Sequence, residues 1–354
     1  MRLRVGLIGA GFARRVQLPG LRLVPGVTPT AIASHHRANA ETTAREFEIP
    51  HVFDDGIELA RSPHVDLVIV SSTPPGHVQY AIAALEAGKH VLCEKPMALD
   101  AAEAARMVEA AERRPSCVAW LDHELRYEPN RRKIRDLIRD GAIGEVRHIE
   151  LTLKPYLRGD GRPQTSAAPW TWWYDRSQGG GILGAVGSHL IDQCRFWTGR
   201  EVTQVAGRVA TFLRERRDAT GVVRAVTADE MVSGVLSLGE DVVATVTLSA
   251  VAHHGTGHLA QITGSDGTLL LTGETKLEIG KAGGPLEDIS APDDLIGQTT
   301  VNNMWARSFV RLMRDFAAVA RGAAPTGEPA GFRDGWHIQR VLDALRAGRG
   351  MPLD

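Results

Sequence analysis

The segment Arg4-Val5-Gly6-Leu7-Ile8-Gly9-Ala10-Gly11-Phe12 decides the fold of the first part of this 354-residue chain. Its apolar first half predicts a short strand, and two glycines, Gly9 and Gly11, follow that strand directly. Glycines at this point allow a tight turn and let backbone N–H groups approach a pyrophosphate at a helix N-terminus. The dinucleotide fingerprint has a third small residue where this chain has Arg14. The turn therefore predicts a dinucleotide site at Gly9, Gly11 and Phe12, although any strand-to-helix turn favours glycine.

Strand-like and helix-like segments alternate from this turn outward through the first 121 residues. Predicted strands cover residues 30–33, 65–70, 90–93 and 117–121, and predicted helices cover residues 38–47, 78–87 and 101–113. Asp100 and Glu103 have the spacing of a capping box, which marks the start of the last of these helices. Strands that alternate with helices indicate βαβ units and a parallel sheet. We therefore expect a doubly wound Rossmann domain over residues 1–121.

The pattern changes after about Glu150. Alternating runs predict strands at residues 202–212, 231–238, 242–250, 259–263 and 268–271, with polar loops at 213–229 and 280–294 and helices at 309–320 and 332–346. The turn Ser265-Asp266-Gly267 joins two of these strands as a hairpin. Residues 122–354 are therefore expected to form an α+β domain for substrate binding and oligomerisation, with an open, mostly antiparallel sheet.

Length and composition agree with two domains and exclude some functions. A chain of 354 residues exceeds what one core usually serves. A net charge of −1 gives no reason to expect a nucleic-acid partner. We expect neither a membrane span nor a signal peptide, because the sequence contains no apolar run of about 18 residues and no apolar leader. The cysteines, Cys93, Cys117 and Cys194, are odd in number and widely spaced, which favours a cytoplasmic protein.

The end of the second predicted strand bears on the choice of cofactor. A carboxylate there would accept a hydrogen bond from a ribose 2′-hydroxyl and repel a 2′-phosphate. This chain has Ser34, His35 and Arg37 instead, which would tolerate or attract the phosphate. The alternative is a solvated turn whose serine starts a helix. We expect NADP or NAD as cofactor, with NADP bound at least as well as NAD.

Two long motifs carry a resemblance to a known family. The first runs from Ser71-Ser72-Thr73-Pro74-Pro75-Gly76-His77 to Cys93-Glu94-Lys95-Pro96, and the second is Gly179-Gly180-Gly181-Ile182-Leu183-Gly184-Ala185-Val186-Gly187-Ser188-His189-Leu190-Ile191-Asp192. Shorter matches lie at residues 124–127 and 143–146. With these motifs the chain resembles the Gfo/Idh/MocA family, which includes glucose–fructose oxidoreductase and inositol dehydrogenases, over essentially its whole length.

The resemblance implies a nicotinamide cofactor and a catalytic lysine, Lys95. Oxidation of an alcohol removes a hydroxyl proton as hydride leaves, and a desolvated lysine can accept that proton. Glu94 would orient or pair with Lys95, and Pro96 would fix the turn, through a cis peptide if the geometry requires one. The further cofactor-binding residues that the resemblance implies are Ser72, Thr73, Pro74, His77, Glu94 and Lys95.

The same resemblance implies that His189 is a general acid–base partner or a substrate ligand. Many members have an aspartate four residues earlier, where this chain has Ala185. Asp192 lies three residues after His189 and would share a helical face with it, so that it could orient the imidazole instead. The alternatives are that His189 is structural and that Asp192 binds Arg195.

Aromatic residues before the second motif suit a sugar, whose C–H faces pack on rings. Trp172 and Trp173 are the candidates for such contacts, together with Lys95 and His189, and Arg126 and Tyr127 are candidates for the rim. The aromatic residues could equally pack a loop. His253, His254 and His258 have no carboxylate near them in the sequence, so we expect no metal.

These features together predict an NAD(P)-dependent oxidoreductase that acts on the CH–OH groups of a sugar, inositol or related polyol. Two alternatives stay open: an NAD-dependent glycosidase on the same fold, and a non-catalytic regulator that binds a dinucleotide. An open antiparallel sheet would pair with a second copy, so we expect a homo-oligomer, a dimer or a tetramer.

Overall fold

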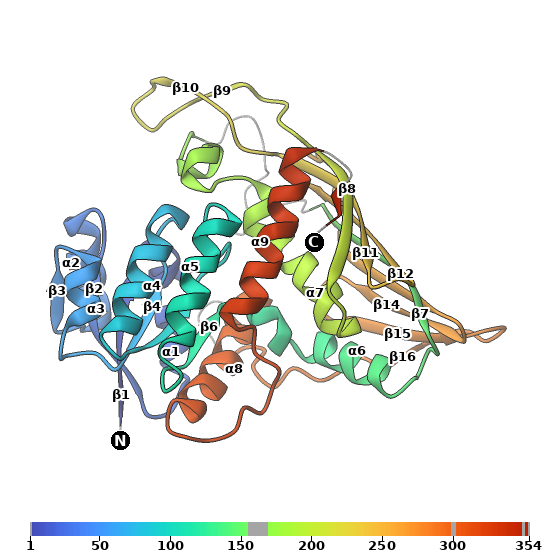
Figure 1. The fold of residues 1–354 in the computed structure, drawn as a ribbon, viewed down its shortest axis with the longest axis horizontal. Helices are drawn as coiled ribbons and strands as arrows, with labels where there is room; N and C mark the ends of the chain where they lie inside the picture. The colour runs from blue at the N-terminus through green and yellow to red at the C-terminus, as the bar shows by residue number, and fades with distance from the viewer. Residues whose placement is uncertain (1, 155–168, 299–301, 349–350, 353–354) are drawn as a thin grey trace. The chain divides into compact units, whose positions relative to one another are not determined.

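The computed structural model describes residues 2–154, 169–298, 302–348 and 351–352, and the chain forms two compact units (Figure 1). The first unit contains residues 1–128 and 293–336, and the second contains residues 129–292 and 337–354. This division differs from the predicted boundary at residue 121, because residues 293–336 return to the first unit. The reason is apolar burial: Phe309 and Phe316 share one core with Val5 and Leu7 of the first strand.

The first unit is built on a six-stranded parallel sheet. Its strands follow the order β3-β2-β1-β4-β5-β6, with β1 Leu3–Ile8, β2 Val27–Ala33, β3 His51–Phe53, β4 Leu67–Val70, β5 His90–Cys93 and β6 Ala119–Leu121. This is the order of a dinucleotide-binding Rossmann domain, so the predicted doubly wound sheet is confirmed. The strand β3 was not predicted, because three half-buried residues carry no readable alternation.

Helices flank the sheet of the first unit. They are η1 Ala13–Gln17, α1 Leu18–Leu21, α2 Arg37–Phe47, α3 Gly56–Arg61, η2 Pro74–Gly76, α4 His77–Glu86, α5 Ala101–Glu112, η3 Glu124–Tyr127 and α8 Met304–Val319. The predicted capping box starts α5: the Glu103 N–H donates to Asp100 Oδ1 at 2.8 Å, and Glu103 Oε2 accepts from the Leu99 N–H at 3.0 Å. The segment η1 is a π-helical turn, a feature often found at functional sites.

The second unit is built on a nine-stranded sheet in the order β16-β15-β14-β13-β7-β12-β11-β8-β17. Among the described strands of this sheet, β7 and β12 are the pair that runs parallel, so the predicted mostly antiparallel sheet is confirmed. The bounds are β7 Val146–Lys154, β8 Val202–Ala210, β11 Met231–Leu238, β12 Val242–Ser249, β13 Gly257–Gly264, β14 Gly267–Thr272, β15 Lys276–Lys281, β16 Leu286–Asp288 and β17 Met351–Pro352.

Two predicted loops contain strands. The segment 213–229 forms a hairpin of β9 Glu215–Arg217 and β10 Val223–Ala225, and the segment 280–294 contains β16. The sequence interpretation was wrong here because β10 and β16 are fully exposed, and their side chains therefore do not alternate between apolar and polar.

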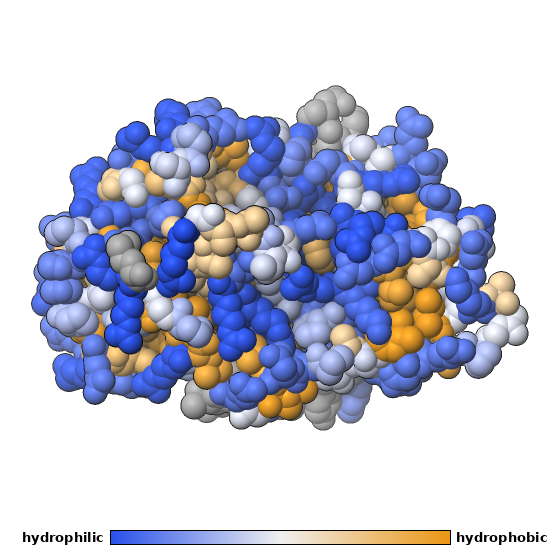
Figure 2. Space-filling view, turned by 90° about the horizontal axis from the view of Figure 1, so that it is seen from below, coloured by the Kyte–Doolittle hydropathy of each residue, from blue (hydrophilic) through white to orange (hydrophobic). Residues whose placement is uncertain are grey.

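Helices α6 Pro129–Arg139, α7 Ser188–Thr198 and α9 Phe332–Ala347, together with the turn η6 Leu183–Gly187, contribute to the core against the sheet of the second unit (Figure 1). The helix α9 starts in the first unit, and two short helical turns, η4 Trp172–Tyr174 and η5 Arg176–Gln178, contain no buried residue. Buried and more exposed residues alternate along β11 and β12. Val235 of β11 and Val243 of β12 are among the exposed ones. Hydrophilic side chains predominate on the face that Figure 2 shows. Within the described ranges, no helix is long and apolar enough to cross a membrane.

Candidate active site

The carboxyl ends of four neighbouring strands bring the candidate residues of the first unit together. Backbone bonds continue past the strand ends: the Ser71 N–H donates to the Ile8 carbonyl at 2.7 Å, the Glu94 N–H to the Val70 carbonyl at 2.9 Å, and the Asp122 N–H to the Cys93 carbonyl at 2.7 Å. The segments after β1, β4, β5 and β6 therefore lie along one edge of the sheet. This is the edge at which parallel α/β sheets bind ligands.

The two glycines of the first turn have different surroundings. Gly9 has a φ of 110°, and a Cβ there would lie 2.2 Å from the Ser71 carbonyl oxygen, so the fold itself requires this glycine. A Cβ at Gly11 would meet nothing within 4 Å. Gly11 starts the helical segment that continues through η1, so open space lies at a helix N-terminus, as a pyrophosphate requires. The residues at this turn, including the half-buried Phe12, fit a dinucleotide.

After β2, Arg37 has two acidic neighbours, Glu41 and Asp54, that the sequence interpretation did not include. Arg37 donates to Glu41 at 2.8 Å and also pairs with Asp54, and these hydrogen bonds raise the pKa of its guanidinium, Asp54 most. Ser34 is half-buried and His35 is exposed. The predicted cation for a 2′-phosphate is therefore already paired with two carboxylates.

His77 joins the turn after β4 to the turn that carries Lys95. Its Nδ1 lies 3.0 Å from the Pro96 carbonyl oxygen and its Nε2 3.0 Å from the Ser72 carbonyl oxygen. Burial lowers the pKa of His77, and a neutral ring can donate to only one of these two carbonyls. The Lys95–Pro96 peptide bond is cis, as the sequence suggested. Thr73 and Pro74 lie between Ser72 and His77, so this predicted cofactor segment is connected through His77 to the turn that carries Lys95.

Lys95 is half-buried, and its neighbours include residues that the sequence interpretation missed. Its Nζ lies 5.9 Å from the centre of the Trp305 ring, on α8. Below it, the Gln17 amide Nε2 donates to Glu94 Oε1 at 2.9 Å and to Asp122 Oδ2 at 3.3 Å. Asp122 could have been found, because it follows a predicted strand just as Glu94 does. Gln17 and Trp305 could not, since they come from a π-helical turn and a distant helix.

Burial dominates the electrostatics of the two carboxyl groups. Desolvation raises the pKa of Glu94 and raises that of Asp122 well above its ordinary value. The charge of Lys95 opposes the shift at Glu94, and the charge of Glu94 increases the shift at Asp122. Two neighbouring carboxyl groups in a dry site do not both ionise readily.

The predicted rim residues Arg126 and Tyr127 are engaged by the protein. Arg126 donates to Asp334 Oδ1 and to the Glu328 carbonyl, each at 3.2 Å, and only 7% of its surface is exposed. The Tyr127 hydroxyl donates to Asp315 Oδ2 at 2.7 Å, and its ring lies in the core. Both side chains therefore tie η3 to the segment that returns from the second unit.

In the second unit, α7 carries His189 and Asp192, both almost fully buried. Asp192 Oδ1 lies 4.0 Å from Arg195 Nη1, and Arg195 also donates to Glu201 at 2.5 Å. The predicted alternative partner of Asp192 is thus within reach of it. Ala185 lies in the π-helical turn η6, so the four-residue offset from His189 does not describe a regular α-helix here.

Two glycines before α7 lie close to other residues of the second unit. A Cβ at Gly180 would lie 2.3 Å from the Trp173 carbonyl oxygen, and one at Gly181 would lie 2.4 Å from Asp229 Oδ1. Asp229 Oδ2 accepts the Leu183 N–H at 2.6 Å, at the start of η6. Gly180 and Gly181 are therefore needed for close packing against Trp173 and Asp229 inside the second unit.

The aromatic segment divides into two parts. The Trp170 indole donates to the Ala225 carbonyl at 2.9 Å, and Arg216 lies 4.2 Å over the Tyr174 ring, so both rings hold the β9–β10 hairpin. Trp172 is 39% exposed and meets Trp173 edge to face at 6.1 Å. Of these four rings Trp172 is the exposed one, and the other three are half-buried.

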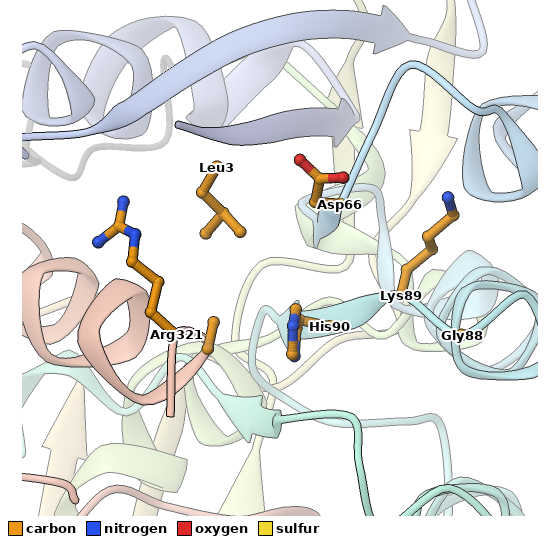
Figure 3. A pocket seen from close by; sticks show the side chains of 7 residues that line it. Leu3, Asp66, Gly88, Lys89, His90 and Arg321 are labelled. Carbon is orange, nitrogen blue, oxygen red and sulfur yellow. The ribbon is translucent and has the colours of Figure 1, made fainter. Parts of the chain in front are cut away.

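Two other features lie away from this chemistry. Burial, and then the charge of Arg131, lower the pKa of His258 to about 3, and the described residues contain no group of three or more His, Cys, Asp or Glu side chains that could hold a metal. A cavity of about 500 Å³ in the first unit is lined by Leu3, Asp66, Lys89, His90 and Arg321 (Figure 3). It lies at the amino ends of β1 and β5, at the opposite edge of the sheet from Gly9 and Glu94.

Comparisons with known proteins identify the family. The sequence profile described as an oxidoreductase family with an NAD-binding Rossmann fold matches residues 3–122, and that of the GFO/IDH/MocA C-terminal domain matches residues 131–270. An uncharacterized oxidoreductase of Synechocystis sp. is 32% identical over 271 residues, 76% of this chain and 71% of the relative. Human glucose-fructose oxidoreductase domain-containing protein 2 is 27% identical over 97% of this chain and 90% of its own length.

Solved structures share the whole fold. Levoglucosan dehydrogenase in complex with NADH and levoglucosan superposes with a TM-score of 0.86 at 22% identity, covering 99% of both chains. An oxidoreductase domain protein from Kribbella flavida gives a TM-score of 0.86 at 26% identity, covering 100% of both chains. The chain belongs to the Gfo/Idh/MocA family of oxidoreductases, and its first unit is an NAD-binding Rossmann domain.

Proposed function

We propose that this protein is an NAD(P)-dependent dehydrogenase or reductase that acts on a CH–OH group of a sugar, inositol or related polyol. The observation that carries the proposal is the position of Lys95, half-buried at the carboxyl edge of an NAD-binding sheet and next to Glu94. The similarity in fold to levoglucosan dehydrogenase and to an aldose–aldose oxidoreductase of Caulobacter crescentus, both proteins named for sugars, supports the substrate class.

In this mechanism four residues of the first unit have a role: Gly9, Gly11, Glu94 and Lys95. A bound nicotinamide cofactor would supply hydride transfer. The turn at Gly9 and Gly11 would hold the pyrophosphate with backbone N–H groups. Lys95 would take the hydroxyl proton of the substrate as general base and return it in the reverse direction. Glu94 would stabilise the ammonium form of Lys95 through its charge.

In the second unit we assign acid–base or substrate-binding work to His189 and sugar contacts to Trp172 and Trp173. Arg126 and Tyr127, which are held by Asp334 and Asp315, are proposed to be structural. His189→Ala should lower kcat by about 10²-fold, the scale of lost acid–base catalysis. Full activity in a folded His189→Ala protein would make His189 structural and leave Lys95 to act alone.

The test of the reaction class is a panel of polyols and sugars with NAD and NADP. Absorbance of the reduced nicotinamide should rise with at least one substrate. Cleavage of a glycoside without net reduction would favour the NAD-dependent glycosidase, and dinucleotide binding without turnover of either kind would favour the regulator. A thermal-shift screen of sugars narrows the panel first, because a ligand that binds only the folded state raises the melting temperature.

We also propose that the protein is a cytoplasmic homo-oligomer, a dimer or a tetramer. Exposed Val235 and Val243 on the sheet of the second unit support self-association. Sedimentation of the purified protein at a monomer mass over a wide concentration range would refute it.

A further inference from the structure

Three buried side chains, those of Gln17, Glu94 and Asp122, contact one another next to Lys95. None of the three is a cation. Gln17 is 0% exposed, Asp122 1% and Glu94 7%, and they come from η1 and from the ends of β6 and β5. The single amide group of Gln17 donates to one oxygen of each acid. Gln17 therefore brings the two carboxyl groups together in a dry site, where burial raises the pKa of both and they do not both ionise readily, so one of them holds a proton.

The hydrogen bonds indicate which acid carries that proton. Gln17 donates to Asp122 Oδ2, but the other oxygen, Oδ1, is buried and accepts no hydrogen bond from any described residue. An ionised Asp122 would leave that oxygen without a donor in a dry site, which is costly. Glu94, by contrast, accepts from Gln17 at Oε1 and from the Lys95 N–H at Oε2, at 3.3 Å. Asp122 is therefore the protonated donor and Glu94 the charged acceptor.

We propose that Glu94 and Asp122 share one proton, held on Asp122, and that Gln17 fixes the pair, so that Lys95 faces one negative charge instead of two. This inference rests on the proposed function for the meaning of Lys95 as a base. A second negative charge would stabilise the ammonium form of Lys95 and keep it protonated when the substrate hydroxyl needs an acceptor. Asp122 is a positioning residue, because it acts through Glu94.

Other titratable groups around the pair are consistent with this reading. The charge of Lys95 acts on both acids, and Glu124 raises the pKa of Asp122 further. The thiol of Cys93 is buried, and its pKa is raised by burial and then by the charge of Glu94. Burial also lowers the pKa of His77, whose ring contacts the Pro96 carbonyl of the Lys95 turn. Within the part of the chain that the structure describes, Lys95 is the cation whose charge acts on both acids.

The first experiment is infrared spectroscopy of the whole protein in D₂O at neutral pH. Wild-type protein should show the carbonyl stretch of a buried, protonated carboxyl group, and Asp122→Asn should remove it. Glu94→Gln should displace or abolish the same band, because the acceptor of the Asp122 proton changes. Asp66→Asn removes an acid that is paired with Arg4 and should leave the band unchanged. Asp229→Asn shows which part of the spectrum comes from Asp229, a second buried acid whose pKa is raised by burial.

The second experiment measures the pH dependence of Lys95 modification by an amine-reactive reagent, read by mass spectrometry. Asp122→Asn keeps a neutral donor to Glu94 and should leave the midpoint of reactivity unchanged. Asp122→Leu removes the donor, leaves the charge of Glu94 unshared, and should raise the midpoint by about one pH unit. Neither measurement needs a substrate. If the protein turned over no polyol, the proposed function would be refuted, but the infrared band and the modification midpoint would still test whether Glu94 and Asp122 share a proton.

Two results would overturn the inference. One is a wild-type spectrum that contains no band removed by Asp122→Asn. The other is a midpoint for Asp122→Leu equal to that of wild type. If Asp122→Leu does not fold, the isosteric Asp122→Asn and Glu94→Gln proteins decide by their spectra alone.

Discussion

Lys95 Nζ lies 5.9 Å from the centre of the Trp305 ring, although the two residues are far apart in the sequence. A cation over an indole face is worth about 0.5–1 kcal/mol at a partly exposed site. Trp305→Leu should therefore lower kcat by about two- to fivefold by loosening Lys95, and Trp305→Phe should retain most of the activity. Steady-state kinetics measure this, and equal impairment of the two variants would exclude the ring–cation contact as the cause.

Gly9 and Gly11 should respond differently to substitution. Gly11→Val should fold with an unchanged melting temperature and bind NAD at least about tenfold more weakly, because its side chain fills the space at the helix N-terminus. Gly9→Ala should lower the melting temperature, since its Cβ meets the Ser71 carbonyl. Calorimetry with NAD separates the two effects. Unaltered affinity in a folded Gly11→Val protein would place the pyrophosphate elsewhere.

The choice between NADP and NAD should depend on the acids around Arg37. Asp54→Asn removes one of its two carboxylate partners and should raise the affinity for NADP relative to NAD by about threefold, the scale of an exposed ion pair. Ser34→Asp should shift the preference toward NAD by repelling the 2′-phosphate. Competitive binding with both cofactors checks the two variants. A wild-type preference for NAD of about tenfold or more would contradict the expectation from Ser34 and Arg37.

His258 should make the second unit sensitive to acid. Its pKa is lowered from 6.5 to about 3 by burial and then by Arg131. Between these values the unfolded chain binds a proton at His258 that the folded chain does not, so stability falls as the pH falls through this window. His258→Gln should flatten the decline of the melting temperature in that range. Parallel curves for wild type and variant would show that His258 does not contribute.

Much of the fold was readable from the sequence because its elements are local. The run before Gly9, the buried strand near Val68 and the capping box at Asp100 each lie within a few residues, and each predicted the element that the structure contains. The hairpin turn at Asp266 likewise joins β13 and β14.

The rest depended on contacts between distant segments. Nothing near Phe316 in the sequence says that its helix packs on the first unit, where it meets Trp120 at 5.0 Å. Gln17 reaches the two acids from the π-helical turn η1, a local geometry that the sequence pattern does not predict. The glycines at 180 and 181 accommodate the Trp173 carbonyl and the Asp229 carboxylate, contacts that their place in the sequence does not reveal.

The most direct test of the account compares Lys95→Met with Lys89→Met in the presence of NAD and a polyol that the wild type oxidises. Lys89 lies at the opposite edge of the sheet and donates to the Val65 carbonyl at 2.8 Å, so it serves as the matched control. Lys95→Met should keep its affinity for NAD and lose about 10²-fold or more in kcat, while Lys89→Met stays near wild type. A Lys95→Met enzyme with near-native kcat would contradict the assignment of Lys95 as the base.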